Sequence, residues 1–150
     1  FMSGMMHDVG ILVFNYLIPK EYNNFLIAKD ISNSDQPVET LEKATFGVDH
    51  QELGAMFLEK HWELPKILVG GATDHHKDYI SSGSINLSHI VSASNKLANE
   101  NNISHPIMSQ HKEELSEDFI TKANLSSNEI EGFIEKTKIG LLAFDSMNNT

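Results

Sequence analysis

The chain has 150 residues, a length that fits one domain able to bury a hydrophobic core. It has no cysteine, which excludes disulfides, thiolate metal sites and cysteine nucleophiles and fits a reducing cytoplasm. A formal net charge of −10 disfavours contact with nucleic acid, and no apolar run approaches the ~20 residues of a membrane span. We therefore expect a cytoplasmic protein without nucleic-acid or membrane partners.

The first segment is strongly apolar from its first residue. Its apolar residues recur at helical spacing and form one stripe: Met2, Met5, Met6, Val9 and Val13. Gly10 lies within this stripe, and it indicates either close packing or a break in the helix. Phe1 is not an initiator residue and no polar lead precedes the stripe. We therefore expect an upstream half of the domain that packs on this helix.

Further helices follow in chain order. Pro19, Pro37 and Pro65 suit helix starts, Gly47 suits a helix end, and Asp49 can cap the helix that follows it. The predicted helices cover 19–31, 37–47, 50–62, 65–76, 85–99, 113–123 and 126–144.

No segment shows convincing two-residue alternation, so the predicted fold is all-α. The apolar stripes of 2–13, 53–62 and 130–144 are expected to be mostly buried, with Trp62 in the core.

Five polar residues form a candidate metal site. His7 and Asp8 are adjacent, His50 begins a predicted helix, and His75 and His76 end one. Neighbouring helical residues point about 100° apart, so His7 and Asp8 can both reach one ion beside the helix. Imidazole and carboxylate ligands suit Zn, Fe, Mn or Ni. A hydrogen-bonded pair that only braces the helix remains the alternative for His7 and Asp8.

His61 and His111 lie in polar surroundings, and His89 and His105 have no ordered carboxylate partner, so we expect solvated or structural roles for these four histidines. Glu42 either hydrogen-bonds a ligand histidine or is solvated. The glycines of "VGGAT", residues 69–73, lie in a helical stretch rather than after a strand, which argues against a phosphate-binding loop.

Three stretches resemble the HDOD domain, the HD-related output domain of bacterial signalling proteins: "FMSGMMHDVGILVF", "ATFGVDHQELGAMFLEKHWELPKILVGGATDHH" and "IVSASNKLA". The resemblance covers residues 1 to about 100, whereas 106–150 match no known motif. It implies the all-α helical bundle of the HD superfamily without its N-terminal half. Residues 1–150 would then be the C-terminal portion of an HDOD-like domain.

The resemblance also implies roles for single residues. Metal-dependent phosphohydrolases of the HD superfamily bind metal through an early His, an HD pair and a late Asp, and the pair here is His7–Asp8. Related two-metal phosphodiesterases add histidines that correspond to His50, His75 and His76. Asn95 stands where the late Asp is expected, and a neutral amide supports metal binding and water activation less well. The Gly-Tyr-Pro signature of these phosphodiesterases is absent after His76.

Three functions follow from these residues. The first is a noncatalytic bacterial signal-transduction domain that acts through protein partners and needs no cofactor. The alternative is a phosphohydrolase or phosphodiesterase that depends on a divalent transition metal. In the third, the metal is bound but has only a structural role.

Overall fold

The computed structural model describes residues 1–28, 34–77, 83–103 and 114–148, and these ranges contain helices and no strand. The all-α prediction is therefore confirmed. The helices are α1 (Met2–Met6), α2 (Val9–Leu17), α3 (Pro19–Ile27), α5 (Val38–Phe46), α6 (His50–Lys60), α7 (Lys66–Thr73), α8 (Leu87–Glu100), α9 (Glu117–Ala123) and α10 (Ser127–Asn148). None of the described helices combines the length and apolar character needed to cross a membrane.

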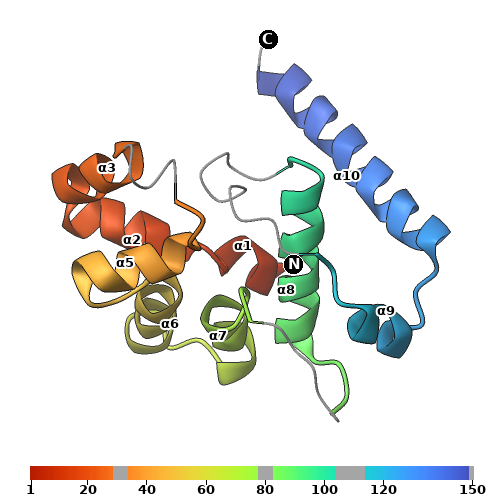
Figure 1. Ribbon diagram of the computed structural model, residues 1–150, viewed down its shortest axis with the longest axis horizontal. Coiled ribbons are helices and arrows are strands. Elements are labelled where there is room, and N and C mark those ends of the chain that lie inside the picture. Colours follow the sequence, from red (N-terminus) through yellow and green to blue (C-terminus); the bar gives the residue numbers. More distant parts are fainter. Residues whose placement is uncertain (29–33, 78–82, 104–113, 149–150) are drawn as a thin grey trace.

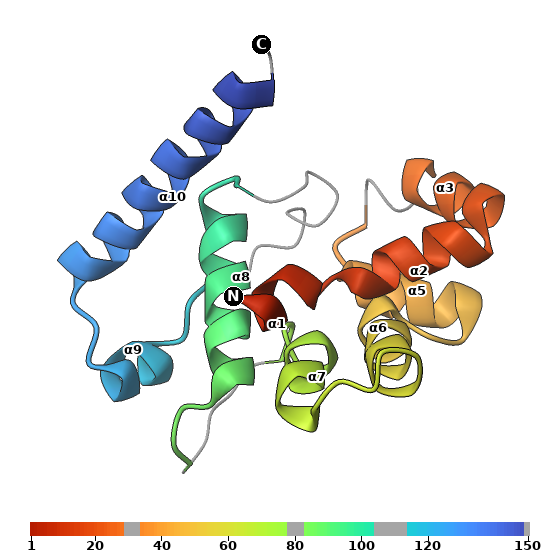
Figure 2. The same ribbon diagram turned by 180° about the vertical axis from the view of Figure 1, so that it is seen from behind.

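The helices form a chain of packed neighbours. α2 packs on α6, α6 on α7, α7 on α8, and the short α1 packs on α7. Helices α2, α3 and α5 lie at one end of the molecule, and α10 lies beyond α8 at the other end (Figures 1 and 2). The junction of α1 and α2 thus comes close to α6 and α7, and the polar centre forms there.

Local signals in the sequence explain most helix ends. Pro19 occupies the first turn of α3, and Pro37 and Pro65 directly precede α5 and α7. Gly47 ends α5 in the left-handed conformation, with φ at 77°. The Asp49 carboxylate accepts a hydrogen bond from the Glu52 backbone N–H at 2.8 Å and caps α6 as predicted.

The first segment is two helices rather than the single one expected. The break lies at His7 and Asp8, and Gly10 continues α2. A Cβ at Gly10 would lie 1.9 Å from the carbonyl oxygen of His50 and 2.9 Å from the backbone N of Gly54. Of the two alternatives for Gly10, close packing is therefore correct: this glycine lets α2 approach the start of α6.

Two apolar clusters form the core. One contains Phe14, Tyr22 and Phe25, and the other contains Leu58, Val69 and Ala72. The prediction that the stripe of residues 2–13 is mostly buried is wrong for Met2 and Met5, which are 48% and 67% exposed. The buried residue of α1 is Ser3, because its hydroxyl donates to the Leu68 carbonyl oxygen and packs against Gly71.

The other two stripes also differ from expectation. Within 53–62, Leu58 is fully buried, but Met56 and Trp62 are about half exposed, so Trp62 is not a core residue. In α10 the large apolar side chains are mostly exposed: Phe133, Ile139, Leu141, Leu142, Phe144 and Met147. Helical periodicity identifies an apolar face, but it does not identify what covers that face.

Candidate metal centre

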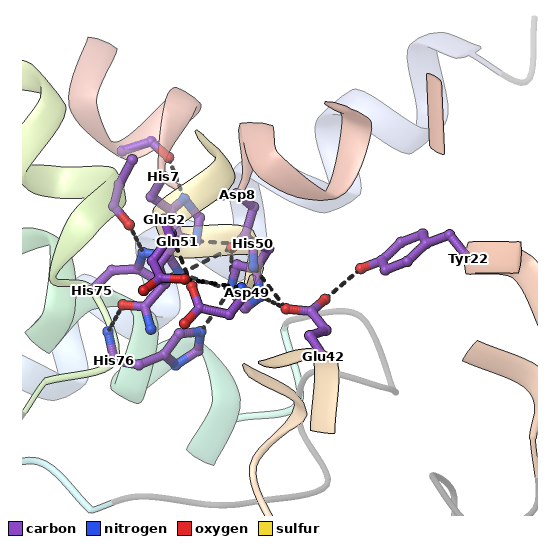
Figure 3. A network of polar contacts seen from close by, with 12 residues as sticks. His7, Asp8, Tyr22, Glu42, Asp49, His50, Gln51, Glu52, His75 and His76 are labelled. Atoms are coloured by element: carbon purple, nitrogen blue, oxygen red, sulfur yellow. Dashed lines mark hydrogen bonds and ion pairs between the residues drawn. The ribbon is translucent and has the colours of Figure 1, made fainter. Parts of the chain in front are cut away.

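The polar centre is built from three separate parts of the chain. Asp8 lies in the turn between α1 and α2, His50 is the first residue of α6, and His75 and His76 follow the end of α7. One ligand atom from each of these four residues lies within 4.8 Å of the others. The structure therefore brings together four of the five predicted ligands (Figure 3).

The distances between these ligand atoms match the size of a single ion. His50 Nε2 lies 3.3 Å from His75 Nε2 and 3.2 Å from His76 Nε2. Asp8 Oδ1 lies 3.1 Å from His75 Nε2 and 3.8 Å from His50 Nε2. Ligands bound about 2.0–2.1 Å from a tetrahedral metal are separated by roughly 3.3 Å. A first-row divalent ion therefore fits between them with little rearrangement.

The hydrogen bonds of the rings orient their lone pairs toward this space. His50 Nδ1 lies 2.6 Å from Glu42 Oε2, and His75 Nδ1 lies 2.9 Å from the Ala72 carbonyl oxygen. Both acceptors take an N–H from Nδ1, so the neutral rings present an Nε2 lone pair to each other. Facing lone pairs need a shared proton or a cation between them. The donor set therefore fits a divalent transition metal.

The electrostatics favour the metal-binding forms of three of these ligands. Burial lowers the pKa of His75, and burial together with the charges of His75 and His50 lowers the pKa of His76 to about 2. Burial alone would raise the pKa of Asp8, but hydrogen bonds from His7 and His75 hold it well below its usual range. Neutral imidazoles and an ionised carboxylate are the forms that bind metal.

His50 behaves differently from the other two histidines. Burial lowers its pKa, but the hydrogen bond to Glu42 and the charge of Glu42 outweigh burial, so the pKa is raised above 6.5. A positive charge is thus favoured at His50, and a proton competes there with any metal ion.

His7 does not join this group of four. Its Nε2 lies 3.1 Å from Asp8 Oδ2, the other carboxylate oxygen, and its Nδ1 lies 2.7 Å from the Gly4 carbonyl oxygen. Asn95 of α8 lies beside His7, and both line a groove between α1 and α8. His7 therefore lies at the edge of the cluster, with its ring centroid 4.8 Å from that of His75.

Several residues support this centre. Glu42, left open between two roles, is fully buried and hydrogen-bonds His50. Sequence reasoning missed Tyr22, whose hydroxyl donates to Glu42, and Gln51, whose side-chain oxygen accepts from the His76 N–H at 3.4 Å. Tyr22 lies in an apolar helical pattern, so no local signal marks it. Gln51 directly follows the candidate ligand His50, and this position was the signal in the sequence that could have identified it.

The remaining histidines lie outside the cluster or outside the described ranges. His61 is exposed. His89 is buried, and its Nδ1 accepts a hydrogen bond from the Asn86 N–H at 3.0 Å in the capping box of α8, which agrees with the expected structural role. His105 and His111 belong to residues 104–113, which the structure does not describe.

The described residues thus form a helical domain in which Asp8 of the His7–Asp8 pair meets three further histidines. The chain belongs to the HDOD domain family, because the model of that family matches residues 1–78. HDOD domains are members of the HD superfamily. The match includes Asp8, His50, His75 and His76 but ends before Asn95, although the resemblance was followed to about residue 100. No curated protein and no solved structure matches the chain.

Proposed function

We propose that this HDOD domain is a noncatalytic module of a bacterial signalling protein, that it acts through protein contacts, and that it holds one divalent transition metal. Asp8, His50, His75 and His76 would bind the ion. The observation that carries the proposal is that these four residues place one ligand atom each around a common space, while His7 lies outside it.

The metal has a structural role in this proposal. Its ligands come from the α1–α2 turn, the start of α6 and the segment after α7, so one ion cross-links three parts of the chain. When bound, such an ion also acts as a Lewis acid. Binding energy of this kind adds directly to the stability of the folded state.

The surroundings of His7 support a role without catalysis. Two-metal hydrolysis requires a second ion that holds the attacking and leaving oxygens. The groups available for it beside the cluster are His7, the outer oxygen of Asp8 and Asn95. His7 is held by Gly4 and Asp8, and the amide of Asn95 brings no negative charge to neutralise an ion.

Exposed apolar side chains support action through protein contacts. Leu12, Tyr16 and Leu17 of α2 are 68%, 85% and 61% exposed, and further large apolar residues are exposed along α10. Leu12, Tyr16 and Leu17 line one groove together with Trp62, and a contiguous apolar patch of this kind is typical of protein interaction surfaces.

A metal-dependent phosphohydrolase or phosphodiesterase is the second candidate. One observation favours it: the Asp8 side chain is 37% exposed, so solvent reaches the edge of the cluster. An ion held there would be accessible to a water molecule and a phosphoryl oxygen.

The two candidates differ in turnover. We expect the protein loaded with Mn, Fe or Zn to hydrolyse bis(p-nitrophenyl) phosphate no faster than the His7→Ala/Asp8→Ala double variant. A metallohydrolase would lose orders of magnitude of rate in that variant, because the activated water is lost with the ion. Robust wild-type hydrolysis that disappears in the double variant would establish the enzyme and reject the regulator.

Asn95→Asp is the complementary probe. A carboxylate beside His7 restores a negative ligand, so we expect tighter metal binding without turnover. Ser94→Asp adds the same charge at the neighbouring exposed position of α8 and serves as the control.

A further inference from the structure

A buried carboxylate connects the aromatic core to the metal centre. Glu42 of α5 is 0% exposed. Its Oε1 accepts a hydrogen bond from the Tyr22 hydroxyl at 2.7 Å. Its Oε2 accepts from the His50 backbone N–H at 2.8 Å and lies 2.6 Å from His50 Nδ1. Figure 3 shows Glu42 between Tyr22 on one side and the cluster of histidines on the other.

The burial of Glu42 costs free energy, and a role in packing alone would not explain it. Removing a carboxylate from water is unfavourable unless hydrogen bonds and charge compensate it, and an apolar side chain of similar volume would avoid that cost. Its contacts to His50 engage both the backbone and the ring, so they control where this residue lies and how its ring is turned.

We propose that Tyr22 and Glu42 are positioning residues for the metal ligand His50, and that they link the metal centre to the aromatic cluster of α2, α3 and α5. The inference rests on the proposed metal-binding function and specifies how one ligand is held.

Each contact has a separate task. Glu42 takes the N–H from His50 Nδ1, which leaves the Nε2 lone pair directed at the cluster. Tyr22 holds the other carboxylate oxygen and so restricts rotation of the Glu42 carboxylate. Burial and the charge of Glu42 raise the pKa of Tyr22, so its hydroxyl remains a donor throughout the neutral range.

Tyr22 brings the aromatic cluster into contact with this arrangement. Its ring stacks on Phe14, with centroids 4.7 Å apart and planes inclined by 10°, and it also packs near Phe25 and Phe46. His75, by contrast, is supported within its own turn, through the Ala72 carbonyl oxygen. His50 is thus oriented by Glu42 and Tyr22, which belong to other helices. The packing of these helices therefore affects the position of His50 and of an ion bound to it.

The test uses the full chain, zinc as the probe, and two conservative variants with matched controls. Tyr22→Phe removes one hydroxyl and keeps the ring, and Tyr16→Phe makes the same change at an exposed site of α2. Glu42→Gln removes the charge and keeps the shape, and Glu59→Gln makes the same change at an exposed site of α6. Zinc affinity is measured by competition with a chromophoric chelator. The tautomer of His50 is measured by long-range ¹H–¹⁵N NMR on the metal-free protein, at a pH above the raised pKa of His50, where the ring is neutral.

We expect roughly 10- to 100-fold weaker zinc binding in Glu42→Gln and a smaller loss, about threefold or more, in Tyr22→Phe. The His50 signals should lose the pattern of a single Nδ1–H tautomer in both variants, which a purely structural role would not cause. The two controls should match the wild type. Wild-type affinity and an unchanged tautomer in both variants would overturn the inference while leaving the metal site intact. Absence of zinc binding by the wild type would reject the proposed function and the inference with it.

Discussion

The protonation of single imidazole nitrogens determines which ring nitrogens of the polar centre have a lone pair available for an ion. Glu42 and the Ala72 carbonyl oxygen hold Nδ1 of His50 and His75, so that Nε2 of each ring faces the other ligands. His75 and His76 have lowered pKa values, whereas that of His50 is raised. In the proposed metal site, His50 is therefore the residue at which a proton would compete with the ion most strongly.

This competition predicts how metal affinity depends on pH. As pH falls through the raised pKa of His50, the ring gains a proton, and metal binding must displace that proton. Zinc affinity should therefore fall by up to about tenfold per pH unit below that pKa. The zinc affinity at each pH is measured by titration in competition with a chelator at constant ionic strength.

Glu42→Gln provides the internal comparison, because it removes the main cause that raises the pKa of His50. In this variant the fall in affinity should begin at lower pH. Affinity that stays constant between pH 6 and 8 in the wild type would contradict the assignment of His50 as the proton-sensitive ligand.

Sequence reasoning at this scale succeeded where a motif carried the information. Asp8, His50, His75 and His76 were predicted together and lie together. The position of His7 at the edge of this group was not predictable, because a helix was expected to run through the pair and the structure has a turn there. Tyr22 was missed because its contact to Glu42 is made through the tertiary fold.

At the scale of elements, the close packing of α2 on α6 positions two ligands at once. Asp8 directly precedes α2, and His50 begins α6. The two helices meet where Gly10 lies against the His50 carbonyl oxygen and Gly54. The distance between Asp8 and His50 therefore depends on the absence of a side chain at Gly10.

Gly10→Ala should destabilise the protein. A Cβ there would lie 1.9 Å from a backbone oxygen, so the helices must separate, at a cost of about 1–3 kcal/mol. In Gly4→Ala the added Cβ meets nothing within 4 Å, and alanine favours the helix by up to about 1 kcal/mol. Urea denaturation of both variants measures the free energies of unfolding. If Gly10→Ala proved as stable as Gly4→Ala, the packing of α2 on α6 would be wrong.

Helix starts marked by proline or a capping residue were predicted well from sequence, whereas the predicted helices 50–62 and 65–76 extend beyond the ends of α6 at Lys60 and α7 at Thr73. The helix ends at Pro19, Gly47 and the Asp49–Glu52 capping box depend on residues within about one turn of the chain, so they can be recognised from the local sequence. The break at Asp8 has no such signal. It follows from the packing of α1 on α7 and of α2 on α6, which depends on distant residues.

For the molecule as a whole, burial is unevenly distributed along the chain. Leu58 lies in the core between α6 and α7 with 0% exposure, whereas Leu142 of α10 is 70% exposed. The sequence patterns of these two helices are similarly amphipathic, so periodicity alone did not distinguish the buried face of one from the exposed face of the other.

The same substitution at these two leucines should therefore have different effects. Leu58→Ala removes a fully buried side chain and should cost about 2–5 kcal/mol. Leu142→Ala should change the free energy of unfolding by no more than about 0.5 kcal/mol, as expected for an exposed site. Both values come from chemical denaturation followed by circular dichroism. A large loss in Leu142→Ala would show that α10 is packed in solution.

The number of metal ions bound per chain tests the central claim most directly. Protein loaded with zinc and dialysed to equilibrium should contain one ion per chain, and His75→Ala, which removes a ligand of the cluster, should contain almost none. His61→Ala changes an exposed histidine outside the cluster and should retain the ion. A wild-type protein without metal would contradict the account. Two ions per chain would also contradict it, because His7 and Asn95 would then complete a second site, as a two-metal hydrolase requires.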